Sequence, residues 1–372
     1  MNIPLFEIYN DDDDVNLISE VIASGKFWAV GTKITEFEEK IADYIGTKHA
    51  VTFNSGTSAL HASLLVNGIG KNDEVIVPSF TFIATANAGL FVGAKPVFAD
   101  IESQTFGINP EFVENLITKN TKAIIPVHYG GCPCQINELK DIAEDNNLLL
   151  IEDAAESFGA SVDGKNTATF GDLNVLSFCQ NKIISTGEGG AVVTDSDELY
   201  EKLKLVRSHG RLESADYFSS SNLFEYIDIG YNWRLSNLNS ALGISQIQKV
   251  DKIIEMRQKN VSYLSKRLLE ETDKISIPSV PKGYKHVYQL FSIFAEDRDN
   301  LIDYLSDNGI SSKIYFHPVH QSEFYKNKLN YDVSLPVTES TFEKTLTLPM
   351  YPSITTEQMD YIAETVGKFY QM

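Results

Sequence analysis

Residues 148–153 have the sequence LLLIED, in which an unbroken apolar run ends in two carboxylates. Four adjacent large apolar residues without polar alternation predict a strand buried on both faces, as in the parallel sheets of α/β proteins. Similar runs alternate along the chain with helical stretches such as 57–68 and 136–147. This alternation predicts an α/β fold with a mostly parallel sheet flanked by helices. The other predicted strands span residues 50–53, 74–78, 95–101, 123–128, 173–178 and 190–194.

The pattern changes in the C-terminal third of the chain. A long amphipathic segment over residues 237–271 predicts one long helix, and shorter strand-like runs follow at 287–294 and 312–315. A chain of 372 residues also exceeds the usual size of a single hydrophobic core. We therefore predict a large domain over residues 1–245 and a smaller α+β domain over residues 246–372.

The composition argues against several classes of protein. A formal net charge of −20 and a pI near 4.7 do not suit a nucleic-acid surface, which needs clustered Lys and Arg. Residues 1–14 lack the basic and apolar parts of a secretory signal, and no apolar run is long enough to span a membrane. Three cysteines do not make a disulfide framework. We expect a cytoplasmic protein that binds neither nucleic acid nor a membrane.

Polar residues suited to catalysis or ligand binding lie where predicted strands end. Asp153 closes the run 148–153, and α/β sheets bind ligands at the carboxyl ends of their strands. The turn 54–58, with the sequence NSGTS, lies between a strand and a helix, where backbone N–H groups and hydroxyls suit a phosphate. An ordinary helix cap is the alternative for each of these features.

A third segment combines a lysine with a glycine-rich turn. Residues 177–182 read SFCQNK, and residues 186–190 read TGEGG, which allows the chain to turn tightly. Most lysines are solvated surface residues, so a role for Lys182 depends on the pattern around it.

A metal site is not expected. His128, Cys132 and Cys134 are close in sequence, but a closed zinc site needs four ligands and the chain has no second cysteine pair. The acidic run Asp11–Asp14 is predicted to be a solvated opening of a helix, where negative charge is favourable.

The three segments together suit an enzyme that uses pyridoxal phosphate (PLP). Such an enzyme needs a lysine for the aldehyde, a carboxylate for the pyridine nitrogen, an anion site and a planar group over the ring. The chain resembles the nucleotide-sugar aminotransferases of the DegT, DnrJ and StrS type, a branch of the fold type I PLP-dependent transferases. The stretches that carry the resemblance are residues 24–31, 55–60, 78–82, 152–156, 177–182, 187–190, 230–234 and 348–352.

The resemblance implies roles for individual residues. Lys182 would hold PLP as a Schiff base and Asp153 would pair with the pyridinium nitrogen, which makes these two the expected catalytic residues. Phe82 would stack on the ring, although by itself it reads as an ordinary core aromatic. The expected cofactor-binding residues are Thr57, Ser58, Phe82, Asp153, Glu156, Ser177, Lys182 and Asn232.

Two positions depart from the commonest family pattern. Glu156 stands where most relatives have a glutamine or histidine that contacts the phenolic oxygen of the cofactor. The resulting Asp-x-x-Glu motif resembles the GDP-perosamine synthases and related enzymes that aminate C4 of a sugar. Cys179 stands where relatives often have histidine, and its role is left open.

The resemblance also implies partners. Asn232 matches a family residue that reaches the phosphate from the neighbouring subunit, which implies a homodimer with shared active sites. Arg234 is a candidate for the substrate diphosphate, with a structural ion pair as the alternative, and His320 is a substrate-binding candidate with a structural role equally open. The expected reaction moves an amino group from glutamate to a nucleotide-diphosphate keto-sugar, specifically a 4-keto-6-deoxyhexose, in cell-surface polysaccharide or glycan biosynthesis.

Three alternatives remain to be weighed. A PLP- or pyridoxamine-dependent sugar dehydratase has histidine in place of the Schiff-base lysine, so Lys182 argues against it. A catalytically silent regulatory protein on the same fold is disfavoured because every cofactor position is filled. A dehydrogenase of the Rossmann type lacks its Gly-x-Gly-x-x-Gly fingerprint here. The nucleotide base and the choice between C3 and C4 are left open.

Overall fold

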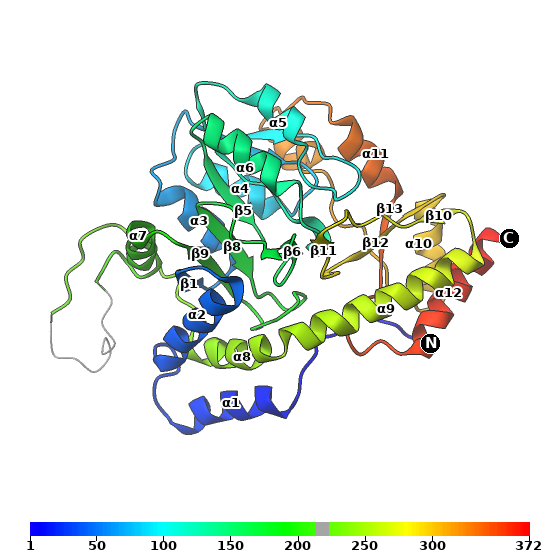
Figure 1. Ribbon diagram of the computed structural model, residues 1–372, viewed down its shortest axis with the longest axis horizontal. Coiled ribbons are helices and arrows are strands. Elements are labelled where there is room, and N and C mark those ends of the chain that lie inside the picture. Colours follow the sequence, from blue (N-terminus) through cyan, green and yellow to red (C-terminus); the bar gives the residue numbers. More distant parts are fainter. Residues whose placement is uncertain (213–222) are drawn as a thin grey trace.

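A mixed, mostly parallel sheet lies at the centre of the molecule (Figure 1). The computed structural model describes residues 1–212 and 223–372. Within these residues seven strands form one sheet, in which β9 alone runs antiparallel to its neighbours β1 and β8. The α/β prediction is confirmed, and the opening stretch LLLIED contains β5. In spatial order the strands are β1 (His49–Phe53), β9 (Gly190–Thr194), β8 (Leu173–Ser177), β5 (Leu149–Asp153), β4 (Thr121–Ile124), β2 (Glu74–Pro78) and β3 (Lys95–Ala99).

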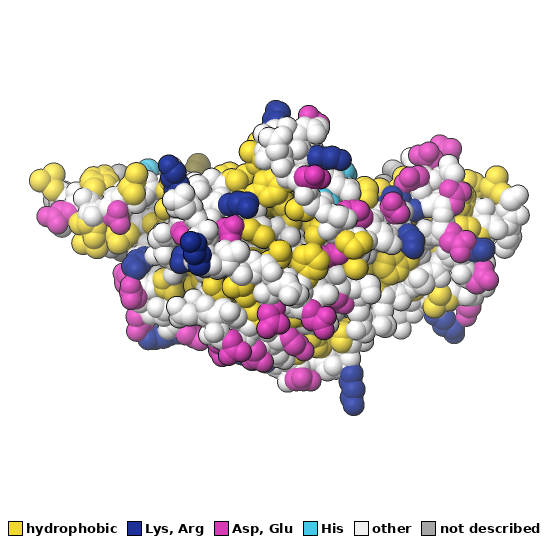
Figure 2. Space-filling model, turned by 90° about the horizontal axis from the view of Figure 1, so that it is seen from above, with side chains coloured by type: hydrophobic (Ala, Val, Ile, Leu, Met, Phe, Trp, Pro, Cys, Tyr) yellow, Lys and Arg dark blue, Asp and Glu magenta, His cyan; other side chains and the backbone are white. Residues whose placement is uncertain are grey.

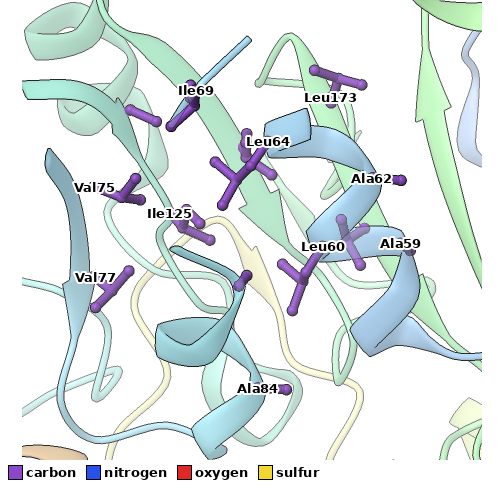
Figure 3. Close-up of a cluster of buried hydrophobic side chains, with 14 of the residues drawn as sticks. Ala59, Leu60, Ala62, Leu64, Ile69, Val75, Val77, Ala84, Ile125 and Leu173 are labelled. Atoms are coloured by element: carbon purple, nitrogen blue, oxygen red, sulfur yellow. The ribbon is translucent and has the colours of Figure 1, made fainter. Parts of the chain in front are cut away.

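Helices cover both faces of this sheet, because its strands are apolar on both sides. Val75 and Val77 of β2 belong to the core on one face, whereas Ile76 belongs to the core on the other. Figure 3 shows Leu60 and Leu64, one turn apart on α3, pointing into the first of these cores. The first face carries α3 (Gly56–Leu65), α4 (Ile83–Phe91) and α7 (Asp197–Arg207), and the second carries α2 (Thr32–Ile45), α5 (Pro110–Leu116), α6 (Ile136–Asp145) and α8 (Asn237–Gln248).

The C-terminal part of the chain builds a second, smaller layer. Within the described residues an antiparallel sheet in the order β10-β12-β13 packs on helices around a separate apolar core. In Figure 1 this layer lies at the right, and its helices α9 and α12 run side by side along its lower edge. Its elements are α9 (Val250–Glu271), β10 (Ile275–Ser276), β12 (Phe291–Ala295), α10 (Arg298–Asp307), α11 (Pro336–Lys344), β13 (Thr345–Leu348) and α12 (Thr356–Tyr370).

Several element predictions in this part were wrong in detail. Residues 237–271 form two helices, α8 and α9, because the backbone leaves helical geometry at Lys249, with φ −113° and ψ 6°. The run 312–315 is not a strand, and Lys313 forms only an isolated bridge to Thr347. The strand β13, by contrast, had not been predicted.

The acidic run near the N-terminus is only partly solvated. Asp11 caps α1 (Asp12–Ala23) through the N–H of Asp13, as expected for an acidic helix start. Asp14, however, is 4% exposed, and its Oδ2 lies 3.0 Å from Nζ of the buried Lys249. The prediction that all four aspartates are solvated was therefore wrong for Asp14.

A short third sheet ties the C-terminal layer to the large sheet region. β11 (Tyr284–Lys285) pairs with β6 (Ser161–Val162), which pairs with β7 (Lys165–Asn166). The N–H groups of Val287 and Leu290 also donate to the carbonyls of Gly131 and Gly130 at 3.1 and 3.0 Å. The predicted boundary between residues 245 and 246 falls inside α8 and stays a prediction.

The described surface carries the acidic excess that the composition implies. Figure 2 shows acidic side chains gathered along the lower edge of one face, with basic side chains scattered among them. Among the helices of residues 1–212 and 223–372, none combines the length and apolar character that crossing a bilayer requires.

Candidate active site

A cavity of about 470 Å³ opens at the carboxyl ends of the central strands. Asp153 ends β5 and Ser177 ends β8, so the parallel arrangement brings both to the same edge of the sheet. The helices α3 and α4 begin at this edge and contribute their first residues. Six of the predicted site residues line the cavity together: Thr57, Phe82, Asp153, Glu156, Ser177 and Lys182.

Asp153 presents a buried carboxylate to the cavity. It is 4% exposed, accepts the hydroxyl proton of Thr85 at Oδ2 (2.8 Å) and the N–H of Ala155 at Oδ1 (3.2 Å). Burial raises the pKa of the Asp153 carboxyl, and the bonds from Thr85 and Ala155 only oppose this shift. A carboxylate has more acceptor sites than these two donors use, so the group can still accept a charged donor.

Lys182 reaches the same cavity from the loop after β8. Its side chain is 14% exposed, and Nζ lies 3.2 Å from Oε1 of Glu156. The other carboxylate oxygen of Glu156 accepts the N–H of Gly130 at 2.8 Å, in the 3₁₀ turn η1 (Tyr129–Gly131). Glu156 therefore fixes the lysine ammonium against a rigid turn of the backbone.

The turn 54–58 forms a hydrogen-bonded loop at the start of α3. Ser55 caps the helix by accepting the N–H of Ser58 at 3.1 Å, and Thr57 faces the cavity. The hydroxyl of Ser58 is within hydrogen-bond distance of Asn54 Oδ1 (2.7 Å) and of the Ser55 carbonyl (2.8 Å). Thus Thr57 offers its side chain to the cavity, whereas the side chain of Ser58 holds the loop.

Gly190 holds this loop close to the sheet. It pairs with Phe53 in β1 and with Ser177 in β8. A Cβ atom on Gly190 would lie 2.5 Å from the backbone N of Gly56, so no larger residue fits without moving the loop.

Aromatic side chains form one wall of the cavity. Phe82 precedes α4, is 56% exposed, and its ring centre lies 5.9 Å from that of Phe316. Phe316 comes from the C-terminal part of the chain, as do Tyr315 and Lys313, which also line the cavity.

The remaining predicted site residues lie outside this cavity in the same chain. Asn232 is exposed and pairs with Ser208 in an isolated bridge. Arg234 donates to Oγ of Ser208 at 3.2 Å and lines a separate cavity of about 690 Å³, which residues of α2 and α7 also line.

His320 lies in the 3₁₀ turn η2 (Val319–Gln321) and is 3% exposed. Its Nδ1 lies 2.6 Å from the hydroxyl of Ser79 and its Nε2 lies 3.3 Å from Glu339. Both ring nitrogens are engaged by protein groups, an arrangement that suits the structural role left open by the sequence.

The sequence interpretation missed several residues of the cavity. Thr85 lies four residues after Thr81 of the 78–82 stretch, with the two hydroxyls 2.9 Å apart, and this spacing could have indicated it. Gly130 lies behind the cavity wall and bonds Glu156 through its backbone N–H, and Lys313, Tyr315 and Phe316 come from a distant segment, so no local pattern pointed to them.

The cysteines and His128 form no metal centre. Among the described residues there is no group of three or more His, Cys, Asp or Glu side chains suited to a metal. His128 Nε2 lies 2.8 Å from the buried carboxylate of Glu152, and its Nδ1 accepts the N–H of Cys134 at 3.1 Å. His128, Glu152 and Cys134 therefore form a buried hydrogen-bond network, in which Glu152 directly precedes Asp153 in the sequence.

A family model described as the DegT/DnrJ/EryC1/StrS aminotransferase family matches residues 9–367. The chain belongs to this aminotransferase family. Members of this aminotransferase family depend on PLP. The lysine, the buried carboxylate and the helix start that share the cavity are therefore the groups to test against this cofactor.

Named relatives match this aminotransferase chain over almost its whole length. A GDP-perosamine synthase of Caulobacter vibrioides is 36% identical over 357 residues, covering 95% of this chain and 94% of the relative. A UDP-N-acetyl-3-dehydro-α-D-glucosamine 3-aminotransferase of Acidithiobacillus ferrooxidans is 33% identical over 359 residues, covering 96% and 94%. The solved structure of Helicobacter pylori PseC, an aminotransferase of pseudoaminic acid biosynthesis, superposes with a TM-score of 0.93 at 30% identity and covers 100% of both chains.

The residues of the cavity fit PLP. Asp153 has acceptor capacity left for a protonated ring nitrogen, which would also offset the cost of its buried charge. The start of α3 and the hydroxyls of Thr57 and Ser177 suit a phosphate dianion. Lys182 lines the same cavity as these two groups, as a lysine that reacts with the aldehyde must.

Proposed function

We propose that this aminotransferase moves an amino group from glutamate to a nucleotide-diphosphate-linked keto-sugar, specifically a 4-keto-6-deoxyhexose, in cell-surface polysaccharide or glycan biosynthesis. The observation that carries the proposal is the cluster of Lys182, Asp153 and Glu156 in one cavity, with Lys182 Nζ 3.2 Å from Glu156. The likeness to a GDP-perosamine synthase over 95% of the chain supports the sugar substrate. The Asp153-x-x-Glu156 motif supports amination at C4.

Each residue has a distinct proposed task. PLP supplies an electron sink for the pair of electrons released when a proton leaves the substrate carbon. Asp153 keeps the ring nitrogen protonated, Thr57 and Ser177 with the start of α3 hold the phosphate, and Ser58 contributes to phosphate binding by holding the loop in shape. Phe82 flanks the ring, while Lys182 first binds the aldehyde and, once released, carries the proton between the reacting carbons.

Glu156 orients Lys182 for these tasks. Its carboxylate accepts from the lysine ammonium and from the N–H of Gly130, so the lysine side chain is held on one side of the cavity. The presence of this lysine also argues against a sugar dehydratase, in which histidine takes its place.

The working form is proposed to be a cytoplasmic homodimer. Leu223, Ile227 and Ile229 are 99%, 55% and 76% exposed in the single chain, an apolar stretch that leads directly to Asn232. A second copy that covers this stretch would remove the apolar surface from water and bring Asn232 to the phosphate of its neighbour. Arg234 and His320 are retained as substrate-binding proposals, of which Arg234 has the better access.

The deciding experiment offers the purified protein glutamate with a panel of UDP-, GDP- and dTDP-linked keto-sugars and measures release of 2-oxoglutarate. We expect release with at least one sugar, and the position of the new amine, read by NMR of the product, decides between C3 and C4. Borohydride treatment should attach the cofactor to Lys182, as read by peptide mass spectrometry.

The Lys182→Ala variant is the matching loss-of-function control. It should still fold, hold PLP only noncovalently, and lose transamination by a factor of roughly 10⁴ or more, because both the covalent link and the proton carrier are gone. Near wild-type turnover in this variant would contradict the assignment of Lys182.

A further inference from the structure

The walls of the active-site cavity carry more acidic than basic groups. Asp153, Glu156 and Glu188 line it, whereas the cations that line it among the described residues are Lys182 and Lys313. Lys182 is already paired with Glu156. A dicarboxylic amino donor that enters this cavity adds negative charge and needs a cation that is not yet neutralised.

Lys313 is held at the cavity without being neutralised. Its backbone N–H and C=O bond to Thr347 of β13 at 3.1 and 2.9 Å, which fixes the position of its Cα. Its Nζ lies over the ring of Tyr315, 4.7 Å from the ring centre, a contact that steadies an ammonium and keeps its charge. No carboxylate of residues 1–212 or 223–372 forms an ion pair with it.

The depth of the two lysines indicates which oxyanion Lys313 meets. Lys182 is 14% exposed and marks the reacting end, while Lys313 is exposed and marks the mouth. The distal carboxylate of glutamate is only a few bonds from the reacting amine, so it must stay within the same cavity. A nucleotide diphosphate is separated from the keto carbon by a whole hexose ring and can extend beyond the mouth.

We propose that Lys313 binds the distal carboxylate of the dicarboxylic amino donor and thereby selects glutamate over monocarboxylic amino acids. The proposal rests on the aminotransferase function proposed above, because it names the donor of that reaction. Lys313 then supplies a charge-assisted hydrogen bond at the mouth, and Tyr315 keeps the ammonium facing the cavity.

The first test measures the half-reaction of the PLP-loaded protein with glutamate and, separately, with alanine, followed by the absorbance of the cofactor. Lys313→Met should raise the half-saturating glutamate concentration about tenfold, the loss expected for one exposed charged hydrogen bond, and leave that of alanine unchanged. Lys313→Arg should restore most of the difference. Lys259→Met removes an exposed lysine of α9 outside the cavity and should change neither value.

An equal loss with both donors would overturn the proposal, since it would indicate a general role in cavity shape. A loss confined to the second half-reaction, with the keto-sugar, would overturn it in favour of diphosphate binding. A second readout keeps this result apart from the proposed function: binding of glutarate, which has no amine and cannot react, measured by calorimetry. If Lys313→Met binds glutarate about tenfold more weakly while Lys259→Met does not, the carboxylate site stands even where no keto-sugar is turned over.

Discussion

Asp153 is the proposed partner of the ring nitrogen, and burial of its carboxylate lowers the stability of the folded protein. Its carboxylate is buried beside Thr85 and Ala155, with no cation bonded to it among the described residues, and burial raises its pKa above the usual value near 3.8. A folded pKa above the unfolded one means that the native state disfavours the charge. The resulting loss of stability appears as the pH rises above about 3.8 and is absent below it.

The Asp153→Asn variant should therefore separate activity from stability. The introduced amide can still accept from Thr85 but cannot hold the ring nitrogen protonated, so turnover should fall about a hundredfold or more while half-saturation by the sugar changes little. The cofactor-free variant should melt at a higher temperature than the cofactor-free wild type at pH 7, and this advantage should disappear near pH 4.

Steady-state kinetics and melting curves at the two pH values check both parts. A variant that keeps its turnover but loses sugar affinity would point instead to substrate contact. A variant that is less stable than wild type at pH 7 would show that the buried Asp153 carboxylate does not destabilise the native state.

The residues that the sequence could identify share a simple property. Asp153 and Ser177 end strands and Thr57 follows the end of β1 by four residues, so the fold class alone brings them to one edge of the sheet. Lys313 comes from a segment more than a hundred residues further on, and its arrival depends on packing between layers. Sequence spacing carries no information about such a contact, nor about a backbone donor such as Gly130.

At the scale of elements, the junction of β1, β8 and β9 decides the shape of the loop 54–58. Gly190→Ala should push Ser55 and Gly56 away from the sheet, because its Cβ would lie 2.5 Å from their backbone atoms. We expect PLP to bind roughly tenfold more weakly and the protein to lose about 1–3 kcal/mol of stability, the usual cost of overpacking.

Cofactor titration by absorbance and thermal melting measure the two effects. Gly70→Ala is the matched control, since the nearest atom to its Cβ would be the carbonyl oxygen of Val92 at an ordinary 3.6 Å. Equal cofactor affinity in the two variants would mean that the loop adapts and that its shape does not depend on Gly190.

The element predictions failed where a long-range polar contact interrupts an apolar pattern. The segment 237–271 has helical periodicity throughout, yet it breaks at Lys249, whose ammonium is buried against Asp14. The partner of Lys249 lies at the other end of the chain. No window along the sequence contains both residues, so a single long helix was the natural prediction.

At the scale of the whole molecule, the shared-site proposal makes a quantitative prediction. In a dimer whose sites use Lys182 of one subunit and Asn232 of the other, mixing inactive Lys182→Ala and Asn232→Ala subunits leaves one site of each heterodimer intact. Random exchange makes half of all dimers heterodimers, so activity should return to roughly a quarter of the wild-type value.

Subunit exchange is verified first by native mass spectrometry of differently tagged variants, and activity is then followed over time. The unmixed variants provide the baseline. If exchange is complete and no activity returns, Asn232 acts within its own subunit and the shared-site model is wrong.

The small sheet formed by β11, β6 and β7 restricts the motions by which substrates can enter and leave the cavity. Together with the bonds from Val287 and Leu290 to the turn at Gly130–Gly131, it joins the C-terminal layer to the turn whose Gly130 N–H bonds Glu156 of the cavity. A hinge motion that separates the large sheet region from the C-terminal layer would therefore have to break several backbone hydrogen bonds at once. Entry and exit of substrates therefore depend on side chains and loops at the rim of the cavity, while the two parts of the chain keep a fixed relative position.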